Sequence, residues 1–229
     1  MSSISKNLET IFYQIEQSAH RAQRETSQIR LLAASKGRTP DEMQEVIEAG
    51  VTLFGENRVQ EARQKIPLCS SRAKWHFIGH LQTNKVRDAV ALFSLIQSID
   101  SFHLAKALSE EADKQGRDLD ILVEVNVSGE KSKFGVDPNN LFPLLEVLNT
   151  LPRLRLCGLM TLAPWVEEAQ KARPYFAALR ECRDRAEAKL GLKLPELSMG
   201  MSHDFVSAIE EGSTIVRIGT AIFGKRNTR

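Results

Sequence analysis

The sequence is poor in cysteine and has no long apolar run. Its three cysteines, Cys69, Cys157 and Cys182, lie far apart and never form a C-x-x-C pair. They predict neither a disulfide framework nor a zinc site, and they favour a reducing compartment. No apolar run is long enough to cross a bilayer, and the polar N-terminus does not have the apolar core of a signal peptide. We therefore expect a cytoplasmic protein without a membrane partner.

An excess of charge of one sign is also absent. The 31 lysines and arginines nearly balance the 29 aspartates and glutamates, and the formal net charge is +2. Basic residues alternate with acidic ones along helical stretches, as on a solvated helix face, and no basic block predicts nucleic-acid binding. The first apolar run, in "LLAASKGRTP", is not followed by G-x-G-x-x-G. This argues against an open, doubly wound dinucleotide-binding sheet.

Eight short, β-prone runs alternate with helical patterns along the chain. The runs are residues 31–35, 52–55, 75–79, 95–99, 120–126, 154–160, 196–200 and 215–219. Strand–helix alternation predicts a parallel sheet, and eight such units predict a closed (β/α)₈ TIM barrel. No proline-, glycine- or serine-rich linker divides the chain. We predict one domain over residues 1–229, in which residues 1–30 form a helix before the first strand.

Glycine and proline mark the ends of the predicted helices. Glycine readily takes the left-handed conformation that ends a helix, and four helical segments end in one: Gly50, Gly116, Gly191 and Gly212. Pro174 lies inside the longest helical segment, residues 167–191, where it predicts a kink or a break.

A lysine, Lys36, directly follows the first strand run. In barrels of this kind the chemistry is found where strands end and the following loops begin. Partial burial there favours the neutral amine, which is a nucleophile and forms Schiff bases with carbonyl compounds. The alternative is a lysine that extends from the strand end into solvent. Taken alone, Lys36 favours the second interpretation, because most lysines are solvated.

The last two strands add features typical of phosphate binding. Gly219 and Thr220 follow the eighth strand run, where free backbone N–H groups and a hydroxyl can hold an anion. Ser202 follows the seventh run at what we expect to be a helix N-cap, and its hydroxyl can also donate to a phosphate. Together with Lys36, these residues predict a pocket for a phosphorylated carbonyl compound.

Pyridoxal 5′-phosphate (PLP) is such a compound, with an aldehyde, an aromatic ring and a phosphate. Arg217 lies two residues before Gly219, so strand alternation places both on the same side. Its guanidinium could face the ring nitrogen and keep that nitrogen unprotonated, which would make the ring a poorer electron sink. The alternative for Arg217 is a surface ion pair.

Several motifs closely resemble one family, the pyridoxal phosphate homeostasis proteins. They include "FGENRVQE", "HFIGHLQTNK" and "MGMSHDFVSAIEEGSTIVRIGTAIFG", and the resemblance extends from Leu31 to Arg226. It implies a fold-type-III PLP barrel like the N-terminal domain of alanine racemase. Members of this family are thought to bind and buffer PLP, and to deliver it to apo-enzymes, without an established turnover reaction.

The resemblance also implies roles for eight residues. Lys36 corresponds to the lysine that holds PLP as a Schiff base, and Arg217 to the partner of the pyridine nitrogen. The phosphate ligands would be Ser202, Gly219 and Thr220, with Met201 lending its backbone. Asn57 and His80 would line the pocket after the second and third strands.

A PLP-dependent amino-acid racemase is the main alternative function. Such an enzyme needs a second acid/base on the opposite face of the substrate, and in the alanine racemase type a tyrosine from a C-terminal β domain supplies it. This chain ends soon after the eighth strand run, and its tyrosines, Tyr13 and Tyr175, lie in predicted outer helices. We therefore expect a carrier with an open barrel mouth, and a monomer.

Two further features have simpler interpretations. His76 and His80 are four residues apart on one strand, about 13 Å at ~3.3 Å per residue, which is too far to share a metal ion. We predict no metal site and place His76 in the core. The loop 128–136 carries Lys131 and Lys133, which could form a secondary Schiff base or a docking site, although a solvated loop is the simpler expectation.

Overall fold

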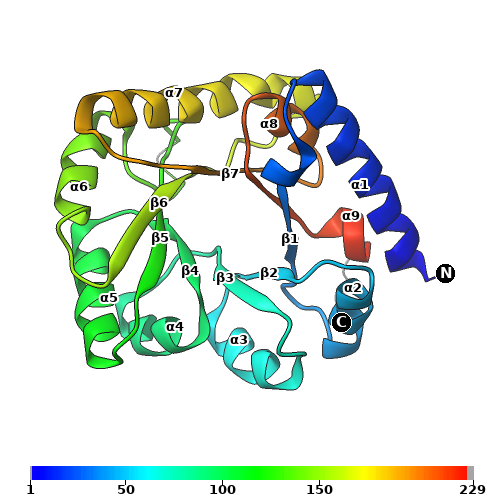
Figure 1. The fold of residues 1–229 in the computed structure, drawn as a ribbon, viewed down its shortest axis with the longest axis horizontal. Coiled ribbons are helices and arrows are strands. Elements are labelled where there is room, and N and C mark those ends of the chain that lie inside the picture. The colour runs from blue at the N-terminus through cyan, green and yellow to red at the C-terminus, as the bar shows by residue number, and fades with distance from the viewer. Residues whose placement is uncertain (1, 131, 226–229) are drawn as a thin grey trace.

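The computed structural model describes residues 2–130 and 132–225. Within them, eight parallel strands close into a barrel in chain order, and the last strand pairs with the first (Figure 1). The strands are β1 (Arg30–Ala34), β2 (Leu53–Glu56), β3 (Lys74–Phe77), β4 (Leu95–Ile99), β5 (Leu119–Glu124), β6 (Leu154–Met160), β7 (Glu196–Met201) and β8 (Ile215–Ile218). The predicted (β/α)₈ barrel is confirmed.

The helices form an outer layer around the ring of strands (Figure 1). They are α1 (Ser3–Arg21), α2 (Pro40–Glu48), α3 (Val59–Lys65), α4 (Val86–Leu92), α5 (Phe102–Lys114), α6 (Leu141–Leu148), α7 (Arg173–Leu190), α8 (Phe205–Glu210) and α9 (Thr220–Phe223). Short 3₁₀ turns cover Thr26–Gln28, Ile66–Leu68, Thr83–Lys85, Pro138–Asn140 and Ala169–Ala172. In the described part of the chain, no helix is both long and apolar enough to span a membrane.

The predicted strand runs match the observed strands to within two residues at either end. The predicted break at Pro174 is also confirmed: a 3₁₀ turn ends at Ala172 and α7 begins at Arg173. Proline is favourable in the first turn of a helix, because the N–H that it does not have would be unpaired there. The four predicted helix-ending glycines all have positive φ.

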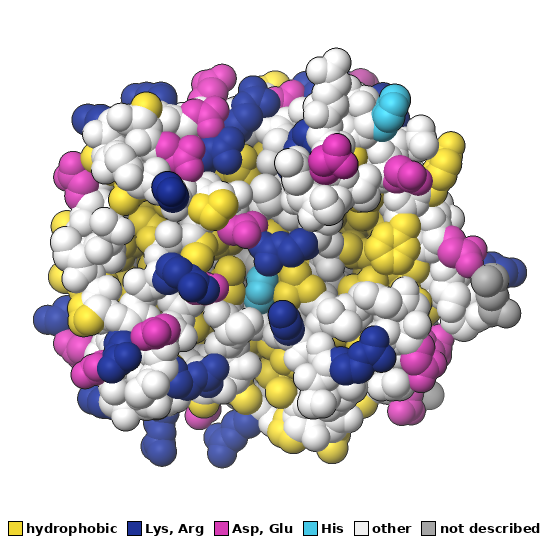
Figure 2. Space-filling view, in the orientation of Figure 1, with side chains coloured by type: hydrophobic (Ala, Val, Ile, Leu, Met, Phe, Trp, Pro, Cys, Tyr) yellow, Lys and Arg dark blue, Asp and Glu magenta, His cyan; other side chains and the backbone are white. Residues whose placement is uncertain are grey.

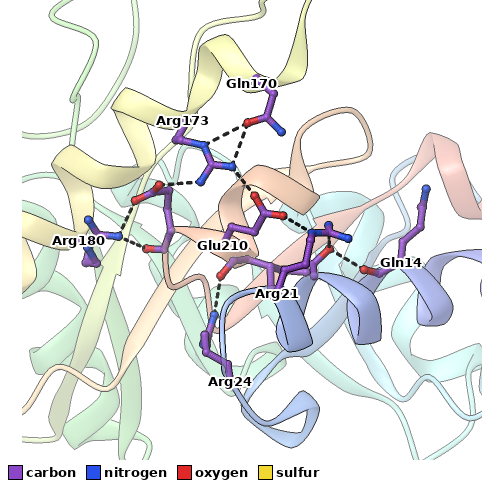
Figure 3. A network of polar contacts seen from close by, with 10 residues as sticks. Gln14, Arg21, Arg24, Gln170, Arg173, Arg180 and Glu210 are labelled. Atoms are coloured by element: carbon purple, nitrogen blue, oxygen red, sulfur yellow. Dashed lines mark hydrogen bonds and ion pairs between the residues drawn. The ribbon is translucent and has the colours of Figure 1, made fainter.

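The N-terminal helix α1 closes one side of the molecule. Its buried residues Ile4, Leu8, Ile11 and Ile15 recur every three or four positions and form one apolar face. A network of arginines and glutamates then ties α1, α7 and α8 together (Figure 3). In this network, Glu210 binds Arg21 and Arg173, and Arg24 donates to two backbone carbonyls of the α8 region.

On the face shown in Figure 2, basic and acidic side chains are interspersed, in keeping with the small net charge.

Candidate functional site

A cavity of about 480 Å³ opens at the mouth of the barrel, where the strands end. Residues that follow β1, β2, β3, β6, β7 and β8 contribute to its wall. The lining residues are Ala34, Lys36, Arg38, Asn57, Ile78, Leu162, Trp165, Met201, Ser202, His203, Arg217, Gly219 and Thr220. Seven of the eight site residues predicted from the sequence are therefore brought together.

His80 is the one that does not line this cavity. Its ring stacks on Phe134, with centroids 3.8 Å apart and planes at 11°, and its Nδ1 lies 3.7 Å from Asp100 Oδ2. These contacts place it beside the loop after β5, so its role in ligand binding stays a prediction.

Lys36 enters the cavity because side chains alternate at the end of β1. Ala34 and Lys36 both line the cavity, whereas Ser35 between them is fully buried and donates to Glu56 Oε1 at 2.7 Å. Lys36 is half-buried, and among the described residues its amine has no hydrogen-bond or ion-pair partner. The amine is thus available to a ligand in the cavity.

The turn after β8 provides two N–H groups that point at one oxygen. The N–H groups of Gly219 and Ala221 both donate to Ser202 Oγ, at 3.2 Å each. Gly219 also packs closely against β1, where an added Cβ would lie 3.2 Å from the carbonyl oxygen of Ala34. The two N–H groups therefore converge on one acceptor oxygen, an arrangement that also suits an anion.

The prediction that Ser202 is a helix N-cap is wrong. Helix α8 begins at Phe205, and Asp204 is the N-cap residue. The reason is the turn that follows β7: the N–H of Met201 donates to Asp204 Oδ1 at 2.6 Å, and the N–H of Asp204 donates to the carbonyl of Met201 at 3.1 Å. Both backbone groups of Met201 are used within this turn, so its side chain, 37% exposed, is the part that is free to meet a ligand.

Arg217 is buried inside the barrel, 4% exposed, which excludes a surface ion pair. Its Nη1 donates to Ser198 Oγ at 2.6 Å, and its Nη2 donates to the carbonyl of Thr161 at 2.7 Å. Burial lowers the pKa of Arg217 to about 10, against the opposing effect of Glu124 and Asp204. The guanidinium is therefore still charged at neutral pH, and three of its five N–H groups remain for other partners.

A chain of hydrogen bonds through the barrel interior holds Arg217 in place. Ser198 Oγ donates to Gln97 Oε1 at 2.6 Å, and Gln97 Nε2 lies 3.0 Å from His76 Nδ1. Because the amide nitrogen can only donate, His76 is neutral with its proton on Nε2. Burial lowers the pKa of His76 to about 3. His76 is thus a core residue, as predicted.

Two residues near the site, Glu124 and Arg38, were not predicted from the sequence to belong to it. Burial raises the pKa of Glu124, at the end of β5, to about 7. Arg38 donates to the carbonyls of Phe223 and Gly224, at 3.1 and 2.5 Å, and so connects the loop of Lys36 to α9. An arginine beside a loop lysine is too common a pattern to have revealed this contact.

Two contacts hold described residues of the loop 128–136. Asn126 Nδ2 donates to the carbonyl of Glu130 at 2.9 Å, and Lys133 pairs with Glu130 at 3.2 Å. Lys131 lies outside the described residues, so the prediction for it is not addressed. Within residues 2–130 and 132–225, no three His, Cys, Asp or Glu side chains are placed to share a metal ion.

Comparisons with known proteins give a consistent result. The family model of the alanine racemase N-terminal domain matches residues 7–227. A pyridoxal phosphate homeostasis protein of Aquifex aeolicus is 45% identical over 222 residues, which are 96% of this chain and 97% of that protein.

Solved structures agree in fold. The structure of PipY of Synechococcus elongatus, described with PLP bound, has a TM-score of 0.86 and 35% identity, covering 97% of this chain and 100% of that one. An alanine racemase of Clostridium difficile has a TM-score of 0.76 at 16% identity, covering 97% of this chain and 58% of the racemase. At that identity the second likeness concerns the fold alone.

Proposed function

Because this chain belongs to the family of pyridoxal phosphate homeostasis proteins, we propose that it binds PLP at the barrel mouth and contributes to PLP homeostasis. The observation that carries the proposal is a cavity lined by both Lys36 and Ser202, the residue at which the N–H groups of Gly219 and Ala221 meet. Its volume of about 480 Å³ is typical of small-molecule sites.

Lys36 would hold the cofactor as a Schiff base. Its neutral amine would form a C=N bond to the aldehyde carbon in place of the C=O bond, whose oxygen would leave as water. When bound, PLP supplies an electrophilic carbonyl and a conjugated ring. The amine of Lys36, which has no partner among the described residues, is suited to this role.

The other lining residues would orient the cofactor. Gly219 and Thr220, with Ser202, would bind the phosphate, because the turn after β8 already directs two N–H groups at one oxygen. Arg217 would face the ring nitrogen with the N–H groups that Ser198 and Thr161 leave free. A guanidinium donates hydrogen bonds and accepts none, so it would hold that nitrogen unprotonated.

We propose a carrier without catalytic turnover. Relatives across nearly the whole length are named as homeostasis proteins, whereas the likeness to a racemase concerns the fold alone. Neither tyrosine lines the cavity, and Tyr13 on α1 is 62% exposed. In the racemase alternative, a lining residue would have to supply the second acid/base. Delivery of PLP to apo-enzymes, a monomeric state and a cytoplasmic location stay predictions.

A spectroscopic titration tests the proposal. On addition of PLP, the wild-type protein should gain the visible absorption band of a lysine Schiff base, and Lys36→Ala should not. The matched control is Lys85→Ala, a change outside the cavity lining, which should keep the band. A band of full strength in Lys36→Ala would show that the cofactor is linked elsewhere.

A further inference from the structure

The backbone on both sides of Lys36 is held by one ion-paired unit. Lys65 at the end of α3 has its Nζ 2.8 Å from the carbonyl oxygen of Ser35, the residue before Lys36. The N–H of Gly37, the residue after it, donates to Glu61 Oε1 at 2.5 Å. Lys65 and Glu61 are themselves paired at 2.7 Å, so the two contacts belong to one cluster.

The cluster is anchored inside the protein. Lys65 is 6% exposed, and its amine also binds Glu56 Oε1 at 2.5 Å. Glu56 is fully buried at the end of β2 and accepts the hydroxyl of Ser35 on the same oxygen. Neither Lys65 nor its two carboxylate partners line the cavity. They hold Lys36 from the outer side of the barrel wall.

These contacts restrict the backbone conformation around Lys36, which is followed by a glycine. Gly37 has φ of +69°, a conformation that glycine adopts without strain, and the Lys36 amine has no partner among the residues that the structure describes. The peptide units on either side of Lys36 set its φ and ψ angles, and both are hydrogen-bonded to the cluster. A lysine fixed at its Cα samples fewer positions with its amine than a lysine on a free loop does.

From this geometry we infer that Lys65 and Glu61 are positioning residues that hold the Lys36 amine in place to react with the aldehyde of PLP. The inference rests on the proposed function, in which Lys36 forms the Schiff base. Small displacements of a reacting group lower rates strongly, by about 100-fold for ~1 Å in sensitive cases. Loss of the cluster should therefore lower the rate at which the Lys36 amine reacts with PLP, while the protein still folds.

The experiment compares two glutamates in similar settings. Glu61 pairs with Lys65 four residues on and accepts the N–H of Gly37. Glu187 pairs with Arg183 four residues before it and accepts the N–H of Leu194, at 2.7 Å, without lining the cavity. The variants are Glu61→Ala, Glu187→Ala and Lys65→Met. Rapid mixing with PLP gives the rate at which the absorption band appears, and borohydride reduction with mass spectrometry gives the yield of adduct at Lys36. Thermal unfolding gives the stability of each variant.

Glu61→Ala should slow the appearance of the band by about tenfold or more, while Glu187→Ala, with a comparable loss of stability, should stay within about twofold of the wild type. Glu61→Gln retains an oxygen acceptor for Gly37 and should recover part of the rate. If Lys65→Met does not fold, Glu61→Ala alone tests the inference, because the Glu61 side chain is 26% exposed and we expect the protein to fold without it.

A folded Glu61→Ala protein that reacts at the wild-type rate with the wild-type yield would overturn the inference. If instead the wild-type protein forms no adduct at Lys36, the proposed function itself fails. The wild-type reaction thus separates the two outcomes.

Discussion

At the scale of single residues, the hydroxyl of Ser202 links the sequence to the proposed phosphate site. It accepts hydrogen bonds from the N–H groups of Gly219 and Ala221, although its position in the sequence pointed to a helix N-cap. The register of β7 against β8 shifts by one residue between Ser198 and Met201, and the N-cap of α8 is Asp204, two residues after Ser202. Neither shift can be predicted from spacing.

Removing the hydroxyls of Ser202, after β7, and Thr220, after β8, should weaken PLP retention while the Schiff base can still form. A hydrogen bond to a charged group contributes about 1.5 kcal/mol or more, and about 1.4 kcal/mol is tenfold in Kd. Ser202→Ala with Thr220→Ala should therefore raise the Kd for PLP by at least about tenfold, as measured by equilibrium dialysis. An unchanged Kd would remove the phosphate argument. Thr150→Ala, at an exposed site, is the control.

The buried His76 makes a prediction about acid stability. Its pKa of about 3 lies below the value in an unfolded chain, so between about pH 6.5 and pH 3 the unfolded state binds the additional proton. The free energy of unfolding should therefore fall as the pH falls through this window, by up to about 1.4 kcal/mol per pH unit from this residue. Glu124 has its pKa raised to about 7, so the folded state binds the additional proton and its contribution to the free energy of unfolding rises as the pH falls.

His76→Asn isolates the contribution of the histidine, because the amide oxygen can still accept from Gln97 while the side chain does not titrate. Urea unfolding at pH 7, 6 and 5 should give a smaller loss of stability on acidification for the variant than for the wild type. Equal pH dependence of the two proteins would show that His76 does not titrate as the structure indicates.

At the scale of elements, the order of strands and helices could be predicted from hydrophobic runs and from glycine and proline. The contacts between elements could not. Lys65 looks like any lysine near a helix end, yet it is buried between two carboxylates and a carbonyl of the β1 segment. Its environment is created by β1, β2 and α3 together. Sequence spacing within one helix does not contain that information.

Arg38 connects two elements that carry opposite parts of the site, the loop of Lys36 and helix α9. It donates to two backbone carbonyls and lies 5.1 Å above the ring of Phe223. Arg38→Met should therefore raise the Kd for PLP by about tenfold, because lost positioning reduces affinity as well as rate. Arg24 also donates to two carbonyls, at the α8 side of the barrel, and Arg24→Met is the matched control.

Both arginine variants should lose about 1 kcal/mol or more in the free energy of unfolding, as expected for partly buried carbonyls left without donors. Only Arg38→Met should change PLP binding. Equal effects of the two variants on the Kd would mean that Arg38 acts through general stability rather than through the connection of the two elements.

At the scale of the whole molecule, the described part of the barrel presents a cavity of about 480 Å³ at the ends of its strands, and the family relationship is the basis for proposing PLP as its ligand. A carrier without turnover should not racemise L-alanine: in the presence of PLP, optical rotation should stay constant over hours. A loss of rotation at an enzyme-like rate, absent in Lys36→Ala, would favour the racemase alternative.

We propose the half-buried Lys36 as the residue to which PLP is covalently attached. Borohydride reduction of the PLP-treated wild-type protein, followed by proteolysis and mass spectrometry, identifies the modified lysine. We predict one dominant phosphopyridoxyl modification, on the peptide that contains Lys36. A modification found mainly on another lysine, with Lys36 unmodified, would contradict the account.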